Sequence, residues 1–193
     1  MALKHSFTTS DYLPYDEYKR LVESLEEDGD YRGAAYCVLS FSTALRVSDV
    51  LKIRWCQIIG HTNLVVTEQK TQKTKNITIG PKTEQKIHEL YYKLGQGDYN
   101  AYIVANYRGL PVSRQFLNKL LKDYKEKYNL KIGNFSTHTF RKTFGRYVYE
   151  KMGKTQESLI LLQRIFRHTS INTTLVYLGI RDDEIQDLFR AIG

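Results

Sequence analysis

Residues 137–180 read THTFRKTFGRYVYEKMGKTQESLILLQRIFRHTSINTTLVYLGI, and the helical segments in this stretch set the plan of the whole chain. His138 and Arg141 are three residues apart, so they share one helix face and can point at the same anion. His168 and Tyr177 follow on the later helical segments. A phenol beside two imidazoles and a guanidinium is suited to attack a phosphodiester, because the phenol is the nucleophile and the cations neutralise the transition state. The rest of the chain is then expected to supply further cations and a DNA-binding surface.

Length and charge fit this expectation. The chain has 193 residues and a formal net charge of +8, which suits one domain with a sizeable core and an acidic partner, nucleic acid ahead of membrane. On charge alone, a solvated basic surface remains the alternative. No apolar run is long enough to cross a bilayer, and Cys37 and Cys56 lack metal-ligand spacing and are expected to be buried thiols. We therefore expect a soluble, cytoplasmic protein.

The first fifty residues predict two helices and a junction. Apolar residues recur at helical spacing over residues 9–28, and residues 31–45 are apolar enough for a core helix. Arg46 stands where the core helix ends, with either Ser48 or Asp49 as the cap of a third helix. An arginine at such a junction keeps its stem inside and its head at the surface, where we expect Asp49 to hold it.

The pattern changes to short strands after Trp55. Residues 63–69 and 76–80 predict a β-hairpin whose link, residues 70–75, is rich in lysine. Residues 102–104 are expected to add a third strand beside this hairpin.

Helical patterns return from Pro81 and occupy most of the remaining chain. Ser113 opens a helix with the apolar face Phe116, Leu117, Leu120 and Leu121. The expected caps of the next three helices are Thr137, then Thr155 or Ser158, then Ser170. A tail helix is expected from Ile185, Leu188, Phe189 and Ile192. The predicted fold class is therefore mostly α with a small antiparallel β-sheet, an α+β domain in one folding unit.

Five motifs in a fixed order carry a resemblance to a known family. They are Ala44-Leu45-Arg46-Val47-Ser48-Asp49, Glu68-Gln69-Lys70-Thr71, His138-Thr139-Phe140-Arg141, His168-Thr169-Ser170-Ile171-Asn172-Thr173-Thr174, and Tyr177. Each motif alone is weak, but all five in this order and at this spacing resemble the catalytic domain of tyrosine recombinases, the phage integrase family. The resemblance covers nearly the whole chain.

The resemblance implies a tyrosine recombinase catalytic domain over residues 1–193. It implies site-specific cleavage and rejoining of double-stranded DNA, as in integration, excision or transposition of mobile DNA. Tyr177 would become linked to the DNA 3′ end and release a 5′ hydroxyl, so that neither a metal nor a nucleotide cofactor is needed. A bacterial or phage-encoded protein, monomeric when free and tetrameric on DNA, is implied. Because the family's N-terminal DNA-clamping domain has no room before Thr8, we expect a fragment of a longer protein.

The resemblance also assigns roles to the motif residues. Arg46 and Arg141 would place two planar guanidinium forks on the non-bridging oxygens of the phosphate. His168 would donate a hydrogen bond to the same oxygens. A phenol with a pKa near 10 is protonated at neutral pH, so His138 would help to accept the Tyr177 proton.

The hairpin would supply the acid for the leaving oxygen, with Lys70 preferred to Lys73. Phosphate contacts are expected from Lys73, Lys75, Arg114, Lys119 and Lys122, and such contacts make binding steeply salt-dependent. The alternative for the lysine-rich helix is that its charges only keep the domain in solution.

The sequence departs from the family pattern beside the site. Ala44 stands where the family often has glycine, and Arg167 stands before His168 where the usual pair is Gly-His. Among fifteen tyrosines, Tyr147 and Tyr149 compete with Tyr177 for the role of nucleophile.

Three other functions remain as alternatives. A metal-dependent nuclease would use Glu68, Lys70 and Asp49 around a cation. A type IB topoisomerase would share the phosphotyrosine chemistry, and a DNA-binding module would not use the tyrosine.

Overall fold

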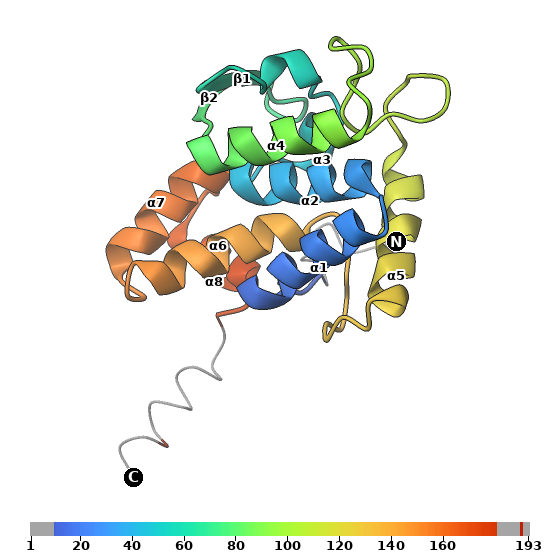
Figure 1. The fold of residues 1–193 in the computed structure, drawn as a ribbon. Helices are drawn as coiled ribbons and strands as arrows, with labels where there is room; N and C mark the ends of the chain where they lie inside the picture. The colour runs from blue at the N-terminus through green and yellow to red at the C-terminus, as the bar shows by residue number, and fades with distance from the viewer. Residues whose placement is uncertain (1–9, 181–189, 191–193) are drawn as a thin grey trace, which may run out of the picture.

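The computed structural model describes residues 10–180 and Arg190. Within them lie eight α-helices, one 3-10 turn and one two-stranded antiparallel sheet (Figure 1). The elements are α1 (Tyr15–Glu27), α2 (Tyr31–Thr43), α3 (Val47–Val50), η1 (Trp55–Gln57), β1 (Asn63–Thr67), β2 (Thr74–Thr78), α4 (Pro81–Lys93), α5 (Arg114–Lys127), α6 (Thr139–Lys151), α7 (Gln156–Phe166) and α8 (Ile171–Leu178). The predicted fold class is confirmed. Of the helices in this described part, none is long and apolar enough to cross a membrane.

The central helix of the fold is α2. It packs against α1, α4 and α6, and Figure 1 shows it between α4 above and α1 and α6 below. Residues 33–40 are all buried, as the apolar run predicts for a core helix. The small side chains of Ala34 and Ala35 allow neighbouring helices to come close, and Tyr36 and Leu39 fill the space between them.

The hairpin places two charged side chains at the edge of the core. β1 and β2 pair with Val66 opposite Lys75. Because side chains alternate along a strand, every second residue faces inward. The inward residues are Leu64, Val66 and Glu68 from β1 and its continuation, and Lys75, Ile77 and Ile79 from β2 and its continuation. Lys75 therefore lies in β2, so the predicted link over residues 70–75 was too long.

The predicted third strand was wrong. Tyr102 forms only an isolated bridge with Arg54, and the next N–H, that of Ile103, donates to Ile53 O over 3.0 Å. This segment packs against the chain that follows α3, so it is held away from the hairpin.

Most of the predicted helix starts are confirmed. The side chains of Ser113, Thr155 and Ser170 cap α5, α7 and α8 by accepting main-chain hydrogen bonds. The Thr137 cap was wrong by one residue, because Thr137 is buried with its N–H bonded to Asn118, and His138 stands at the start of α6.

Three further expectations concern side-chain burial and the chain end. Phe116 is 55% exposed, since the buried stripe of α5 follows Leu117, Leu121 and Tyr124 instead. Cys37 is buried as expected, but Cys56 is only half-buried. The predicted tail helix, with Ile185, Leu188, Phe189 and Ile192, lies outside the described residues.

A second, smaller apolar cluster joins α6, α7 and α8. Its buried members are Ala44, Tyr149, Leu159, Leu162, Phe166 and Leu178. Gly145 of α6 is the point of closest approach, because a Cβ there would lie 2.4 Å from Leu178 Cδ2 and 2.9 Å from Phe166 Cζ. This glycine lets α8, the helix that carries Tyr177, sit against α6.

Replacing Gly145→Ala is expected to destabilise the protein. Alanine would gain about 1 kcal/mol from helix propensity, but overpacking a core costs about 1–3 kcal/mol, so the overlap outweighs the gain. The free energy of unfolding in urea tests this. Gly97→Ala is the control, because a Cβ at Gly97 would meet no atom within 4 Å. Equal effects of the two substitutions would contradict the close packing of α8.

Candidate active site

Arg141, in the first turn of α6, is buried and held by two main-chain carbonyl groups. It donates hydrogen bonds to Ala44 O at the end of α2 and, over 3.0 Å, to Phe166 O at the end of α7. Carbonyl groups at a helix C-terminus carry partial negative charge and lack partners within the helix, so they stabilise a buried cation. Burial lowers the pKa of Arg141, but a guanidinium stays charged at neutral pH.

Arg46 stands directly before α3 with its side chain 20% exposed. Its Nη1 lies 3.2 Å from Oε1 of Glu68, whose side chain is only 1% exposed. The prediction that Asp49 holds Arg46 was wrong. The Asp49 carboxylate points to the hairpin main chain and accepts the Gln69 N–H over 2.9 Å. Within the described residues, neither Arg46 Nη1 nor Glu68 Oε1 makes an aligned hydrogen bond. The arginine therefore keeps hydrogen-bonding capacity for an anion.

Both predicted histidines are neutral at pH 7. Burial lowers the pKa of His168 to about 4, and the charges of Arg141 and Arg46 add to this effect. Burial and the same charges, Arg141 first, also lower the pKa of His138. Nδ1 of His168 lies 3.1 Å from Thr174 Oγ1, so Nε2 is the nitrogen left to face a ligand.

Tyr177 directs a buried hydroxyl into this cluster. Its ring lies 5.0 Å from the His168 ring and 5.2 Å from the Phe166 ring, measured between centroids, and Lys142 Nζ lies 5.2 Å from its centroid. Burial raises the pKa of the phenol to about 12, while the Arg141 charge opposes the shift. The Arg141 guanidinium lies within hydrogen-bonding reach of this hydroxyl, although the two groups are not aligned as in a regular hydrogen bond.

Lys75 is the hairpin lysine that faces these residues. Its Nζ donates to Ile165 O over 3.1 Å. Burial lowers its pKa to about 8, and the charges of Arg141, Arg167 and Arg46 contribute. Lys70, the residue predicted for the acid, is exposed in the turn of the hairpin.

The structure thus brings together five of the six predicted catalytic side chains: Arg46, His138, Arg141, His168 and Tyr177. The two competing tyrosines lie in packing positions, Tyr147 with its ring 4.3 Å from that of Tyr15 and Tyr149 buried in the smaller cluster.

The sequence did not predict that Glu68 and Arg167 pair in this site, and it gave Lys75 only a DNA-binding role. Arg167 Nη1 lies 2.9 Å from Glu68 Oε2, so one carboxylate joins two arginines. The alternation of side chains along a strand could have placed Glu68 and Lys75 in the site. Glu68 continues the inward-facing positions of β1, and Lys75 is one of the inward-facing positions of β2. For Arg167, the signal was its departure from the Gly-His pair.

Most of the predicted DNA-binding side chains are exposed beside this cluster. Lys73 lies on the hairpin link, and Arg114, Lys119 and Lys122 lie on α5. Arg114 is near enough to contribute to the lowered pKa of His138. A cleft of about 670 Å³ next to His138 is lined by Lys122, Lys125 and Ser136 among others. Cations therefore flank the site on two sides.

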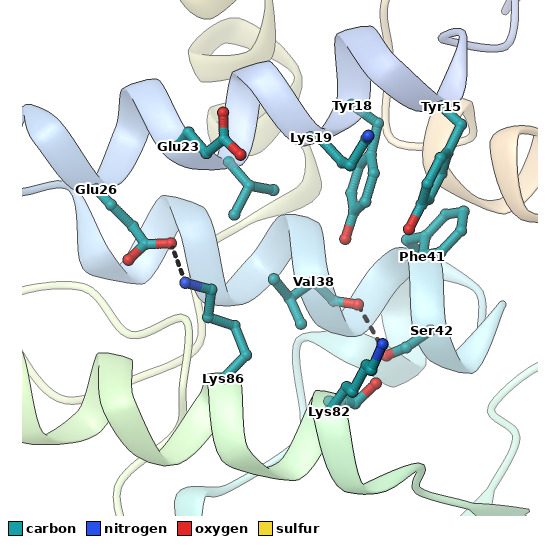
Figure 2. Close-up of a pocket in the computed structure, with 12 residues that line it drawn as sticks. Tyr15, Tyr18, Lys19, Glu23, Glu26, Val38, Phe41, Ser42, Lys82 and Lys86 are labelled. Atoms are coloured by element: carbon teal, nitrogen blue, oxygen red, sulfur yellow. Dashed lines mark hydrogen bonds and ion pairs between the residues drawn. The ribbon is translucent and has the colours of Figure 1, made fainter.

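A groove elsewhere on the molecule does not contain the predicted site. It has a volume of about 290 Å³ and lies between α1, α2 and α4, with Tyr15, Tyr18 and Phe41 along one side (Figure 2). Its Lys86 is neutralised by Glu26 at 2.7 Å. None of the predicted site residues lines this groove.

Each carboxylate of the nuclease alternative is hydrogen-bonded through one of its two oxygens. Glu68 holds Arg46 and Arg167, and Asp49 accepts the Gln69 N–H. Among residues 10–180 and Arg190, no group of three or more His, Cys, Asp or Glu side chains is arranged to hold a metal ion.

Comparisons of the sequence and of the fold with known proteins find integrases and recombinases. The family model described as "Phage integrase family" matches residues 11–184. The probable integrase/recombinase YoeC of Bacillus subtilis is 30% identical over 156 residues, which cover 81% of this chain and 82% of YoeC. The crystal structure of XerA recombinase matches with a TM-score of 0.71 and 21% identity, over 93% of this chain and 64% of XerA. XerH bound to palindromic difH substrate in a post-cleavage complex matches with a TM-score of 0.69 and 16% identity, over 93% of this chain and 52% of XerH. The chain therefore spans most of YoeC but only about half to two thirds of the other two.

Stability is expected to fall as the pH is lowered from about 6.5 to about 4. The pKa of His168 is near 6.5 in the unfolded chain and about 4 in the folded protein. Between these two pH values the unfolded state binds more protons than the folded state. Lowering the pH through this range therefore removes stability that is present above pH 6.5. The free energy of unfolding, measured in urea across this range, should show a smaller slope in His168→Gln than in the wild type. His61→Gln, at an exposed position, should leave the slope unchanged. An unaltered slope in His168→Gln would contradict the burial of this imidazole.

Proposed function

Since the chain belongs to the phage integrase family, we propose that it breaks and rejoins double-stranded DNA at specific sites through a covalent link to Tyr177. The observation that carries the proposal is the meeting of two guanidinium groups, two neutral imidazoles and a buried phenol. The post-cleavage complex of XerH with its difH substrate supports DNA as the partner. Integration, excision or transposition of mobile DNA are the processes that such a reaction serves.

In the cleavage step, Tyr177 Oη forms a bond to the scissile phosphorus and the bond to the 5′ oxygen breaks. The DNA 3′ end is then joined to the tyrosine, and the 5′ strand leaves with a hydroxyl group. Arg46 and Arg141 neutralise the charge that grows on the non-bridging oxygens. His168 donates through Nε2 in the tautomer whose Nδ1 accepts a hydrogen bond from the Thr174 hydroxyl. His138 takes part in removing the phenol proton. Attack by the 5′ hydroxyl on the phosphotyrosine reverses the step, so rejoining needs no added energy.

Lys75 is proposed as the acid for the leaving 5′ oxygen, in preference to Lys70. Its ammonium group faces the arginines and its pKa of about 8 lies near neutrality. An acid is most efficient when its pKa is close to the operating pH, because it is then protonated and still gives up the proton readily. Lys70 and Lys73 are exposed and are assigned to phosphate contacts.

The whole assembly is also proposed to follow the family. The protein would be monomeric when free and tetrameric on DNA, with the exposed cations of α5 and the hairpin on the phosphate backbone. Binding of the duplex should then weaken steeply with salt, because each phosphate contact releases counterions.

Tyr177→Phe is expected to abolish a covalent protein–DNA adduct that the wild type forms. The probe is a pool of duplexes with a randomised centre, each nicked so that the cleaved strand diffuses away and traps the adduct. Adduct is detected in the presence of EDTA on denaturing gels, and Tyr147→Phe is the matched control because that ring packs away from the site. An adduct with Tyr177→Phe, or one that EDTA prevents, would overturn the proposed chemistry.

A change of leaving group distinguishes the proposed role of Lys75 from that of Lys70. Lys75→Ala should slow cleavage by about 10²–10⁴-fold, the usual contribution of general acid catalysis. A substrate with sulfur in place of the 5′ bridging oxygen leaves without a proton, so it should restore the rate of Lys75→Ala to within about tenfold of the wild type. Lys70→Ala should instead weaken DNA binding and show no such rescue. If only Lys70→Ala is rescued, Lys70 is the acid.

A further inference from the structure

Arg167 adopts a backbone conformation that favours glycine. It ends α7 with φ 53° and ψ 47°, in the left-handed region. A side chain with a Cβ is disfavoured there because it crowds the following carbonyl oxygen, so glycine is the usual residue at this position. An arginine at such a site needs a compensating interaction.

The Arg167 side chain supplies that interaction by binding the hairpin at three points. Nη1 donates to Glu68 Oε2 over 2.9 Å and to Thr71 Oγ1 over 3.1 Å, and Nη2 donates to Thr74 O over 3.1 Å. These contacts join the end of α7 to the β1–β2 link. Residue 167 is followed directly by His168, so the same turn also sets the start of the segment that carries the imidazole.

Glu68 divides its two oxygens between two arginines. Oε2 is bonded to Arg167 and to Thr71, whereas Oε1 lies 3.2 Å from Arg46 without an aligned hydrogen bond. Burial would raise the pKa of this carboxyl, but the Thr71 hydrogen bond and the charges of Arg46, Arg167 and Lys75 hold it below its usual value. The carboxylate is therefore ionised, and Arg167 occupies the oxygen that a bidentate pair with Arg46 would require.

We propose that Arg167 is a positioning residue that keeps the Arg46 guanidinium available to the scissile phosphate by engaging Glu68. Without Arg167, Glu68 would turn both oxygens to Arg46, and a buried negative charge would face the phosphate. The Arg167–Glu68 pair thus weakens the contact between Arg46 and Glu68. This inference rests on the proposed function, because it assumes that Arg46 binds the phosphate.

The test compares Arg167→Ala, Glu68→Gln and the double variant in the full chain. The probe is a nicked duplex selected by the wild type from the randomised pool, and the readout is the single-turnover rate of adduct formation at saturating protein. Arg164→Ala removes an exposed arginine from the same helix and serves as the control. Affinity for the intact duplex is measured in the Tyr177→Phe background.

Arg167→Ala should lower the rate of adduct formation by at least about tenfold and change affinity by no more than about threefold, since the lost interaction acts on the transition state. Glu68→Gln in the Arg167→Ala background should recover most of the rate, because the neutral amide no longer sequesters Arg46. A purely structural role predicts the opposite, since the double variant has lost still more contacts between α7 and the hairpin.

Folding is controlled separately. Arg167→Gly removes the same side chain but suits the left-handed backbone, so it should behave as Arg167→Ala does in the rate assay while keeping the wild-type urea midpoint. A wild-type rate in Arg167→Gly, or no recovery in the double variant, would overturn the inference. Absence of adduct from the wild type on the whole pool would instead overturn the proposed function.

Discussion

The buried guanidinium of Arg141 is the interaction on which the site depends. An arginine cannot lose its charge at neutral pH, and an unpaired charge in the interior costs several kcal/mol, so it is buried only where acceptors surround it. Here the acceptors are Ala44 O and Phe166 O, at the C-terminal ends of α2 and α7. Two helix ends and the first turn of α6 must therefore meet at one point. That meeting point fixes Arg46, two residues after Ala44, and His168, two residues after Phe166.

The cations and the nucleophile are attached to the fold in different ways. Arg46 adjoins the large core built around α2, and Arg141 is bonded to Ala44 and Phe166 of the smaller apolar cluster. Tyr177 lies on α8, an eight-residue helix that contacts α6 and α7 through that smaller cluster. A short helix has little stability of its own and depends on such contacts. Arg46 is therefore placed by the large core, whereas Tyr177, the proposed nucleophile, depends on the contacts of the smaller cluster. The close contact at Gly145 is what lets so short an element bring a phenol into register with them.

The sequence predicts the local features of this protein well and its long-range pairs poorly. The caps of α5, α7 and α8 depend on a hydroxyl and an N–H three residues apart, so a short pattern is enough to find them. The partner of Arg46 is different, because Asp49 is close in sequence whereas Glu68 meets the arginine only after the hairpin has formed. The motif pattern pointed to Lys70, but strand alternation places Lys75 on the inward face. Motifs identify which residue types a reaction needs. The alternation of side chains along the strands decides which of the hairpin lysines faces the site.

On the proposed function, the balance of charge lets one arrangement serve both phosphate binding and proton transfer. Four cations, Arg46, Lys75, Arg141 and Arg167, lie around the buried carboxylate of Glu68. A second buried carboxylate, that of Asp49, accepts the Gln69 N–H. Neutral main-chain carbonyls carry much of the remaining compensation, so the site retains an excess of positive charge. That excess contributes to the lowered pKa of Lys75. On the proposed function, a bound phosphodiester would add a negative charge and raise this pKa again, which would keep Lys75 protonated as the proposed acid requires. The repulsion among the cations is relieved by the same phosphate on which they act.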